Sequence, residues 1–372
     1  MTPANGRETV AIIGTGLMGG SFGLAARKRG LTDRVIGFDR SGGELQAAHA
    51  MGAVTEIAPS AGAAAAEASL VVIATPVGTI ATVFGEIAAA LRPEAIVTDV
   101  GSTKHAIVSE VVPLVPPHAH FVGGHPIAGS EHQGVEAADP DLFEGHFWIL
   151  TPTEHTDAAA YGRLVRFLNG LDVHVLSLEP ARHDELLALT SHLPQLIAST
   201  LMRFASDLSA AEGGLPLVTA GGFRDMTRIA ASSPDLWIDI VRQNRAAVAE
   251  VLARFQSALR EAASYLTGED WEGLRATLTA AREARTALPG KPGLVPEALV
   301  ELSVPVPDRP GVLAELTTTM GEAGINIEDL DIFHSPEGGR GTIYLTVDGE
   351  EAAGRAIVAL RRKGFHAERI SS

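Results

Sequence analysis

The 372-residue sequence contains no cysteine, so disulfide bonds and thiolate metal sites are excluded. Basic residues are scarce: 29 lysines and arginines stand against 45 aspartates and glutamates, a formal net charge of −16. Such an acidic chain repels nucleic acids and anionic membranes, so anionic ligands must be held by local groups such as helix N-termini and single arginines. Apolar runs are too short to span a bilayer, and residues 1–10 do not resemble a signal peptide. We therefore expect a cytoplasmic protein with no metal, nucleic-acid or membrane partner.

Short β-branched runs alternate with alanine-rich helical stretches in the first part of the chain. The predicted strands are residues 9–14, 34–39, 70–75, 95–99, 120–123 and 147–150, and the helices between them include 19–29 and 77–91. Alternation of this kind is typical of an α/β fold, with a doubly wound parallel sheet and helices on both faces. It predicts an N-terminal dinucleotide-binding Rossmann domain over residues 1–151.

The rest of the chain divides into a helical part and a small α/β part. Residues 152–287 show long helical periods, mainly at 181–208, with a kink expected at Pro194, and at 236–266. We expect this domain to complete a substrate cleft and to carry a homodimer interface. Residues 288–297 hold three prolines and two glycines, a linker composition. Residues 298–372 follow the βαββαβ order of a ferredoxin-like module; its predicted strands are 300–306, 326–334, 341–347 and 365–370, and its helices are 312–323 and 352–363.

A glycine-rich turn follows the first predicted strand. Gly14, Gly16 and Gly19 form a GxGxxG pattern, with Leu17 and Met18 inside it, at the start of a helix. The first glycine permits a tight turn, the second lets the backbone approach a pyrophosphate, and the third allows close helix packing. The helix N-terminus then offers N–H donors to the phosphates. The segment predicts a dinucleotide site, with a plain glycine turn as the alternative.

The end of the next strand bears on the choice of cofactor. Asp39 lies twenty residues after Gly19, where a carboxylate can accept hydrogen bonds from ribose hydroxyls and repel a 2′-phosphate, which favours NAD. Arg40 could neutralise such a phosphate, so NADP stays open. Thr75 and Pro76 end the third strand and are candidates for the adenosine or ribose side, or for an ordinary strand end.

Two segments place polar side chains near the ends of predicted strands. Residues 97–104 carry Ser102, a candidate for contacts with cofactor and substrate, or for a helix cap. Residues 123–131 present His125 in a glycine-flanked segment that we expect to be a loop. A histidine beside a nicotinamide suits the removal of a hydroxyl proton as hydride leaves the same carbon, because its pKa lies near neutral pH.

A third segment lies in the helical domain. Residues 223–234 set Arg224 and Arg228 four positions apart, which predicts that they share one helical face. Either arginine can anchor a substrate carboxylate or be an ordinary solvated helix residue.

The segments GTGLMGGS, TDVGSTK, GGHPIAGSE, HDELLALTSHLP and FRDMTRIAASSPDLW follow one another in the order seen in prephenate and arogenate dehydrogenases, and the chain resembles that family over about residues 8–285. The resemblance implies NAD-dependent oxidative decarboxylation of prephenate to 4-hydroxyphenylpyruvate. His125 matches the histidine that accepts the proton of the ring hydroxyl, and Ser102 the serine that contacts that hydroxyl and orients the histidine. Arg228 matches the arginine that binds the substrate carboxylate, and Glu131 an acidic residue at the pocket mouth.

One departure from the family pattern concerns the substrate side chain. Gln195 stands where many members have a second histidine, which leaves prephenate and arogenate both open as substrates. His192 is a candidate pocket residue or part of a domain interface. Four further residues match family positions with supporting or cross-subunit roles: His183, Asp184, Arg224 and Trp237.

VPVPDRPGVLAEL and GINIEDLDIF resemble an ACT domain, the small regulatory module of amino-acid enzymes. The turn at Asp308, Arg309 and Gly311 leads into a helix N-terminus, where an amino-acid carboxylate could bind, and Asn326 is expected on the following strand. We expect feedback inhibition by an aromatic amino acid, tyrosine first; the alternative is a module that only assembles subunits.

Competing interpretations are weaker. Phosphoglycerate dehydrogenases with an ACT domain insert the Rossmann unit in mid-chain, and β-hydroxyacid dehydrogenases are expected to use a catalytic lysine in the helical domain. A protein that binds nicotinamide cofactors without turnover would have no need of His125, Ser102 and Arg228.

Overall fold

The computed structural model describes residues 7–129, 132–212, 221–288, 299–307, 309–334 and 340–370. The chain divides into two compact units, Met1–Arg260 and Glu261–Ser372. The first unit contains the large sheet and most of the helical part. The second contains the C-terminal module.

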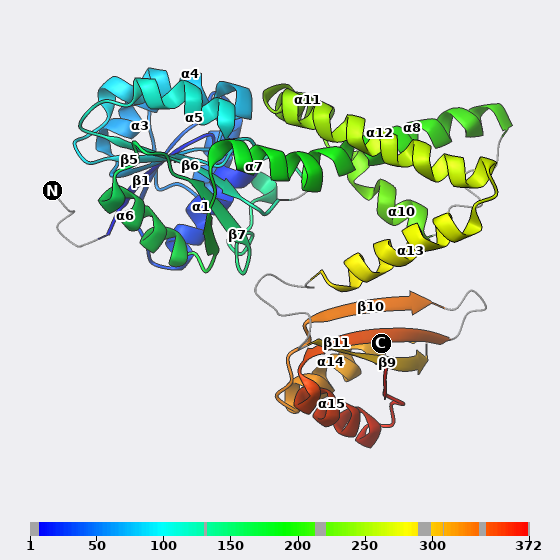
Figure 1. Ribbon diagram of the computed structural model, residues 1–372. Coiled ribbons are helices and arrows are strands. Elements are labelled where there is room, and N and C mark those ends of the chain that lie inside the picture. The colour runs from blue at the N-terminus through cyan, green and yellow to red at the C-terminus, as the bar shows by residue number, and fades with distance from the viewer. Residues whose placement is uncertain are drawn as a thin grey trace. The chain divides into compact units, whose positions relative to one another are not determined.

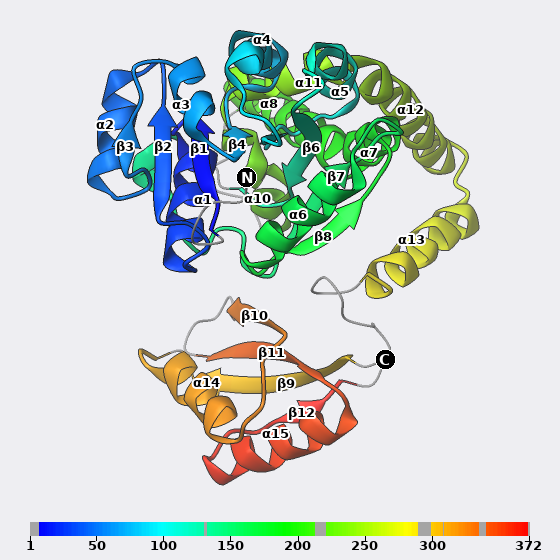
Figure 2. The same cartoon turned by 90° about the vertical axis from the view of Figure 1, so that its left-hand side faces the viewer.

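The first unit is built on an eight-stranded sheet in the order β3-β2-β1-β4-β5-β6-β7-β8, most of which can be followed in Figure 2. The strands are β1 (Thr9–Ile13), β2 (Arg34–Phe38), β3 (Glu56–Ile57), β4 (Leu70–Ile73), β5 (Ile96–Asp99), β6 (His120–Pro126), β7 (Phe147–Thr151) and β8 (His174–Ser177). The six strands predicted from the sequence are all present, and the sheet is parallel except between β6 and β7. That pair is antiparallel because no crossover helix brings the chain back to the other end of the sheet between them.

Helices cover both faces of this sheet, as expected where the central strands are largely apolar and buried. On one face lie α3 (Ala61–Glu67), α4 (Ile80–Ile87) and α5 (His105–Val111), and on the other α1 (Leu17–Lys28) and α6 (Ala158–Asn169), while α2 (Gly42–Ala50) follows β2 (Figures 1 and 2). Because α6 crosses over to β8, which pairs in parallel with β7, the sheet continues past residue 151, where the sequence prediction ends the first domain.

The helices that follow are α7 (Pro180–Leu187), α8 (Leu193–Glu212), α10 (Gly221–Thr227), α11 (Pro234–Gln243) and α12 (Arg245–Thr267). A π-helical turn, η5 (Ala188–His192), separates α7 from α8, so the expected break near Pro194 takes this form. The predicted helix at 236–266 is interrupted at Asn244, between α11 and α12. Within the described residues, no helix has the length and apolar character needed to cross a membrane.

The second unit contains the end of α12, then α13 (Trp271–Thr286) and a ferredoxin-like module. Its elements are β9 (Leu299–Pro307), α14 (Val312–Glu322), β10 (Asp329–His334), β11 (Arg340–Asp348), α15 (Glu350–Arg362) and β12 (Glu368–Arg369). The antiparallel sheet has the order β10-β11-β9-β12, and α14 and α15 pack on one face of it (Figure 2). The predicted βαββαβ order is thus confirmed. Apart from Leu288, the predicted linker at 288–297 lies outside the described residues.

Two strand predictions in this module were too long. β10 begins at Asp329, so Asn326 precedes the strand on which it was expected. β12 covers two residues of the predicted 365–370, because it pairs with β9 only at Ser303 and Leu302.

Candidate functional site

The glycine-rich turn joins β1 to α1 in a way that demands glycine at two positions. Gly14 has φ +96°, and a Cβ there would lie 2.5 Å from the carbonyl oxygen of Ala74. A Cβ on Gly19 would overlap the carbonyl oxygen of Gly14. Gly16 differs, since a Cβ there would meet nothing within 4 Å. The space above Gly16 is therefore open, and no side chain caps the N-terminus of α1. This cradle fits a pyrophosphate.

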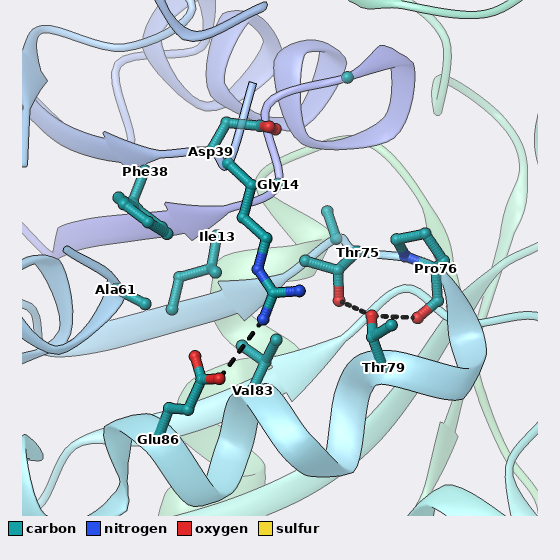
Figure 3. Close-up of a pocket in the computed structure, with 13 residues that line it drawn as sticks. Ile13, Gly14, Phe38, Asp39, Ala61, Thr75, Pro76, Thr79, Val83 and Glu86 are labelled. Carbon is teal, nitrogen blue, oxygen red and sulfur yellow. Dashed lines mark hydrogen bonds and ion pairs between the residues drawn. The ribbon is translucent and has the colours of Figure 1, made fainter. Parts of the chain in front are cut away.

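A pocket of about 340 Å³ opens beside this turn (Figure 3). Its walls come from the ends of β1, β2 and β4 and from α3 and α4, and the residues that line it are Ile13, Gly14, Gly16, Phe38, Asp39, Arg40, Ala61, Ala74, Thr75, Pro76, Thr79, Val83 and Glu86. Six predicted cofactor residues are among them, while Leu17 and Met18 open α1. Asp39 is fixed at the rim, because its two carboxylate oxygens accept hydrogen bonds from the backbone N–H groups of Thr15 (2.7 Å) and Ser41 (2.8 Å). The pocket suits an adenosine whose ribose hydroxyls face a carboxylate.

His125 lies in β6 and not in a loop. It pairs with Ile149 of the antiparallel neighbour β7. The flanking glycines serve close packing: a Cβ on Gly123 would lie 2.5 Å from the Thr151 hydroxyl, and one on Gly124 would lie 2.6 Å from the Asp99 carbonyl oxygen. The loop prediction was wrong because β7 supplies backbone partners for this segment.

A chain of hydrogen bonds leads from His125 into α7. His125 Nδ1 lies 2.8 Å from His183 Nε2, and His183 Nδ1 lies 2.8 Å from Asp184 Oδ1. Asp184 also accepts from the backbone N–H groups of Lys104 (2.7 Å) and His105 (3.0 Å) at the start of α5. Burial raises the pKa of Asp184, but the hydrogen bonds from His183 and the two amides outweigh it, and the net shift is downward. Asp184 is therefore ionised at neutral pH.

The ionised Asp184 determines which nitrogen of each imidazole along this chain carries a proton. Asp184 can only accept, so His183 Nδ1 carries a proton and, in the neutral ring, His183 Nε2 accepts. His125 Nδ1 is then the donor to His183, which leaves His125 Nε2 as an acceptor. Burial, followed by the charges of His183, Lys104 and His192, lowers the pKa of His125 well below its usual value. His125 thus presents an unprotonated Nε2 at neutral pH.

Lys104 is a fully buried cation beside these residues. Its ammonium group forms an ion pair with Asp99, and both side chains have no exposed surface. Asp99 also accepts from the backbone N–H groups of Gly101 (2.9 Å) and Gly124 (3.2 Å). The pair therefore ties the end of β5 to the strand that carries His125. Sequence reasoning assigned Lys104 no role, although it ends the TDVGSTK segment.

His192 and Gln195 form a second buried polar group. Asn244 connects His192 to the histidine chain, because its amide nitrogen lies 2.7 Å from the backbone carbonyl oxygen of Asp184 and 3.2 Å from His192 Nδ1. The rings of Trp237 and His192 pack edge-to-face, with their centroids 6.0 Å apart. Within the described residues, His192 Nε2 and Gln195 Oε1 are buried without a hydrogen-bond partner. Buried polar atoms rarely stay unpaired, so both point to a polar ligand or water.

The remaining predicted substrate residues are more exposed. Ser102 is partly exposed just beyond β5. Arg224 lies on α10, whereas Arg228 begins a 3₁₀ turn, η6 (Arg228–Ala231), and both are exposed in the single chain. The α-helix that carries Arg224 ends one residue before Arg228, and the common helical face of the two arginines stays a prediction. Glu131 lies outside the described residues.

In the C-terminal module, Gly311 caps α14 with φ +87°. Arg309 forms two hydrogen bonds with Glu315, at 3.0 and 2.7 Å, and the Asn326 amide donates to Glu328. Asp308 lies outside the described residues. The roles of these residues in binding an effector stay predictions.

Sequence comparisons decide the family. Residues 22–177 match the nucleotide-binding domain of prephenate dehydrogenase, 179–280 its dimerization domain, and 300–363 the ACT domain. Prephenate dehydrogenase of Bacillus subtilis (strain 168) is 37% identical over 358 residues, which are 94% of this chain and 95% of the relative. The chain belongs to the prephenate dehydrogenase family. It is therefore an oxidoreductase with a C-terminal ACT domain, as its sequence segments predict.

Solved structures agree with this family. Prephenate dehydrogenase from Aquifex aeolicus, in complex with hydroxyphenyl propionate and NAD⁺, is 32% identical with a TM-score of 0.71, covering 75% of this chain and 97% of the other. Arogenate dehydrogenase from Synechocystis is 28% identical with a TM-score of 0.64, covering 74% of this chain and 98% of the other. Solved structures similar to this chain thus include both a prephenate dehydrogenase and an arogenate dehydrogenase.

Proposed function

We propose that the chain catalyses the NAD-dependent oxidative decarboxylation of prephenate to 4-hydroxyphenylpyruvate. The observation that carries this proposal is the chain Asp184–His183–His125, which leaves an unprotonated Nε2 on His125. A buried histidine held in this tautomer is suited to accept a hydroxyl proton.

The reaction needs a base that releases its proton again. His125 Nε2 accepts the proton of the ring hydroxyl as that carbon loses hydride and becomes a carbonyl carbon. When bound, the nicotinamide supplies the hydride acceptor. The bond to the ring carboxylate then breaks, CO₂ leaves, and its electron pair makes the ring aromatic. The ring oxygen takes the proton back from His125 as a phenol, so atoms and charges balance.

The hydrogen-bond chain to Asp184 offsets part of the cost of charging His125 in its buried site. Once Nε2 is protonated, the imidazolium still donates from Nδ1 to His183, which in turn donates to the ionised Asp184. A hydrogen bond to a charged group is stronger than one between neutral groups, so the chain favours the transition state over the ground state. His183 and Asp184 are therefore positioning residues in this proposal.

Substrate contacts are assigned to the groups that the family resemblance indicates. Ser102 orients the ring hydroxyl, Arg228 binds a carboxylate, and Arg224 has a supporting or cross-subunit role. Glu131, which matches an acidic residue at the pocket mouth in the family, lies outside the described residues. We expect Arg228→Ala to raise KM steeply, since a charge-assisted contact is worth about 1.5–3 kcal/mol. An unchanged KM would leave Arg228 a surface residue.

Arogenate is a second candidate substrate, favoured by the buried amide of Gln195. Its Oε1 atom has no partner among the described residues and can accept a hydrogen bond from an ammonium group. Arogenate carries such a group where prephenate has a keto oxygen. His192 Nε2 can donate to a carboxylate of either substrate, because His192 Nδ1 accepts from Asn244.

The decisive experiment is a steady-state comparison of prephenate and arogenate, each with NAD and NADP. NADH formation and equimolar CO₂ release from prephenate would support the proposal, and absence of turnover with both substrates would refute it. His125→Asn should lower kcat by roughly 10²–10⁴-fold and leave the Kd for NAD unchanged.

We further propose a homodimer, formed through the helical region that matches the family's dimerization domain. Its helices expose large apolar side chains, among them Phe204 (61% exposed) and Leu208 (49%) on α8 and Ile238 (56%) on α11. Solvent-exposed apolar surface of this extent is typical of an interface. Phe204→Glu should shift the mass measured by light scattering from dimer to monomer, and an unchanged dimer would place the interface elsewhere.

Tyrosine is the proposed effector of the ACT domain. Residues 298–372 would then be required for inhibition, with the turn at Arg309 and Gly311 receiving the amino-acid carboxylate. Inhibition by tyrosine that persists after removal of these residues would refute this role.

A further inference from the structure

The adenosine pocket contains an ion pair that the family match does not explain. Arg40, just after β2, and Glu86, on α4, both line the pocket, and their side chains meet at 3.4 Å. In Figure 3 the dashed line that ends on Glu86 is this ion pair, with Asp39 on the opposite side of the pocket. The guanidinium group thus reaches across the pocket, away from Asp39.

The charges around the pocket are unequal. Two carboxylates, Asp39 and Glu86, line it, and among the residues that the structure describes Arg40 is the single cationic side chain in its lining. The Asp39 carboxylate cannot turn away easily, because backbone N–H groups hold both of its oxygens. A 2′-phosphate carries a charge of about −2 and is bound in other dinucleotide folds by an arginine at this place. Here the arginine that could bind it is engaged by Glu86.

We propose that Glu86 is a cofactor-specificity residue, which holds Arg40 across the adenosine pocket and so keeps the guanidinium from a 2′-phosphate. The inference rests on the proposed use of NAD. The side chain of Arg40 is 71% exposed and that of Glu86 is 50% exposed, so the ion pair can open. Its coupling changes the Kd for NADP by at most about a factor of five. Glu86 acts in two ways that add: it engages Arg40, and its own charge repels the phosphate.

The test is a double-mutant cycle read by cofactor binding. Calorimetry gives the Kd of NAD and of NADP for the wild type, Glu86→Gln, Arg40→Gln and the double variant. We expect Glu86→Gln to tighten NADP binding roughly tenfold and to change NAD binding less than threefold. In the double variant most of this gain should be lost, because the freed guanidinium is then absent. Glu110→Gln, which removes an exposed carboxylate from α5, is the control for net charge and should change neither Kd.

Three results would overturn the inference. NADP binding to Glu86→Gln could stay as weak as in the wild type, the full gain could persist in the double variant, or the wild type could bind NADP as tightly as NAD. None of these measurements involves prephenate. A wild type that binds NAD and does not turn over prephenate would refute the proposed function and leave this inference standing.

Discussion

Replacing His183 by phenylalanine separates the positioning chain from the base itself. Phenylalanine fills the space of the buried imidazole but cannot accept from His125 Nδ1, which lies 2.8 Å from His183 Nε2 in the wild type. The base would lose the hydrogen bond that fixes its tautomer and stabilises its protonated form. A buried hydrogen bond to a charged group contributes about 1.5–3 kcal/mol, so kcat should fall by roughly 10–150-fold.

Single-turnover measurements of NADH formation would report the rate of the chemical step without a contribution from product release. The Kd for NAD should stay within threefold of the wild-type value, because the adenosine pocket contains neither histidine. His183→Gln is the matched control, since its side-chain amide ends near the place of Nε2 and can accept from His125. It should recover part of the lost rate. A His183→Phe enzyme that turns over within threefold of the wild type would refute the assigned tautomer.

Three further predictions concern stability. First, burial lowers the pKa of His192 to about 4, against about 6.5 in an unfolded chain. As pH falls, the unfolded chain takes up the proton first, so up to about 3 kcal/mol of stability is lost between pH 6.5 and 4. Urea unfolding of the wild type and His192→Asn at pH 7 and 4.5 should show a smaller loss of stability in the variant. Second, Gly14→Ala forces φ +96° on alanine and should lower the free energy of unfolding by at least about 2 kcal/mol and abolish NAD binding, whereas Gly42→Ala, where a Cβ meets nothing within 4 Å, should do neither. Third, Lys104→Met leaves the Asp99 carboxylate buried and unpaired and should lower the free energy of unfolding by about 3–5 kcal/mol. Adding Asp99→Asn should restore much of this stability, and equal stabilities of the single and double variants would contradict the pairing.

The sequence predicted those parts of the fold that repeat a simple pattern. β4 is apolar throughout, and β1 is apolar after Thr9, because both faces of these strands are covered; such short apolar runs can be recognised from the sequence alone. β8 was missed because three of its four residues are exposed, so it carries no such signal. The antiparallel pairing of β6 with β7 was also missed. Strand direction depends on where the chain between two strands returns, which residue types do not reveal.

The candidate site was predictable as a set of positions, but not as a set of contacts. His125 was singled out for its place at the end of a strand, yet the reason for its glycine neighbours was misjudged, since they allow β5 and β7 to approach. His183 is 58 residues from His125 in the chain, and spacing alone cannot indicate that the two rings share a proton. Lys104 was overlooked because lysines are almost never fully buried, and only the ion pair with Asp99 explains its place.

Net charge and local environment act in opposite directions on the pKa of His125, the proposed base. A formal charge of −16 would by itself favour protonated imidazoles, and hence raised pKa values. The pKa of His125, His183 and His192 is lowered instead, and burial is the largest cause in each case. Surface charges are screened beyond about 8 Å at physiological salt, whereas Lys104 acts from within the same buried network. Asp184 reaches His125 only through His183, so its charge matters most after the proton has moved. The neutral base is therefore a property of the buried network and is independent of the acidic surface.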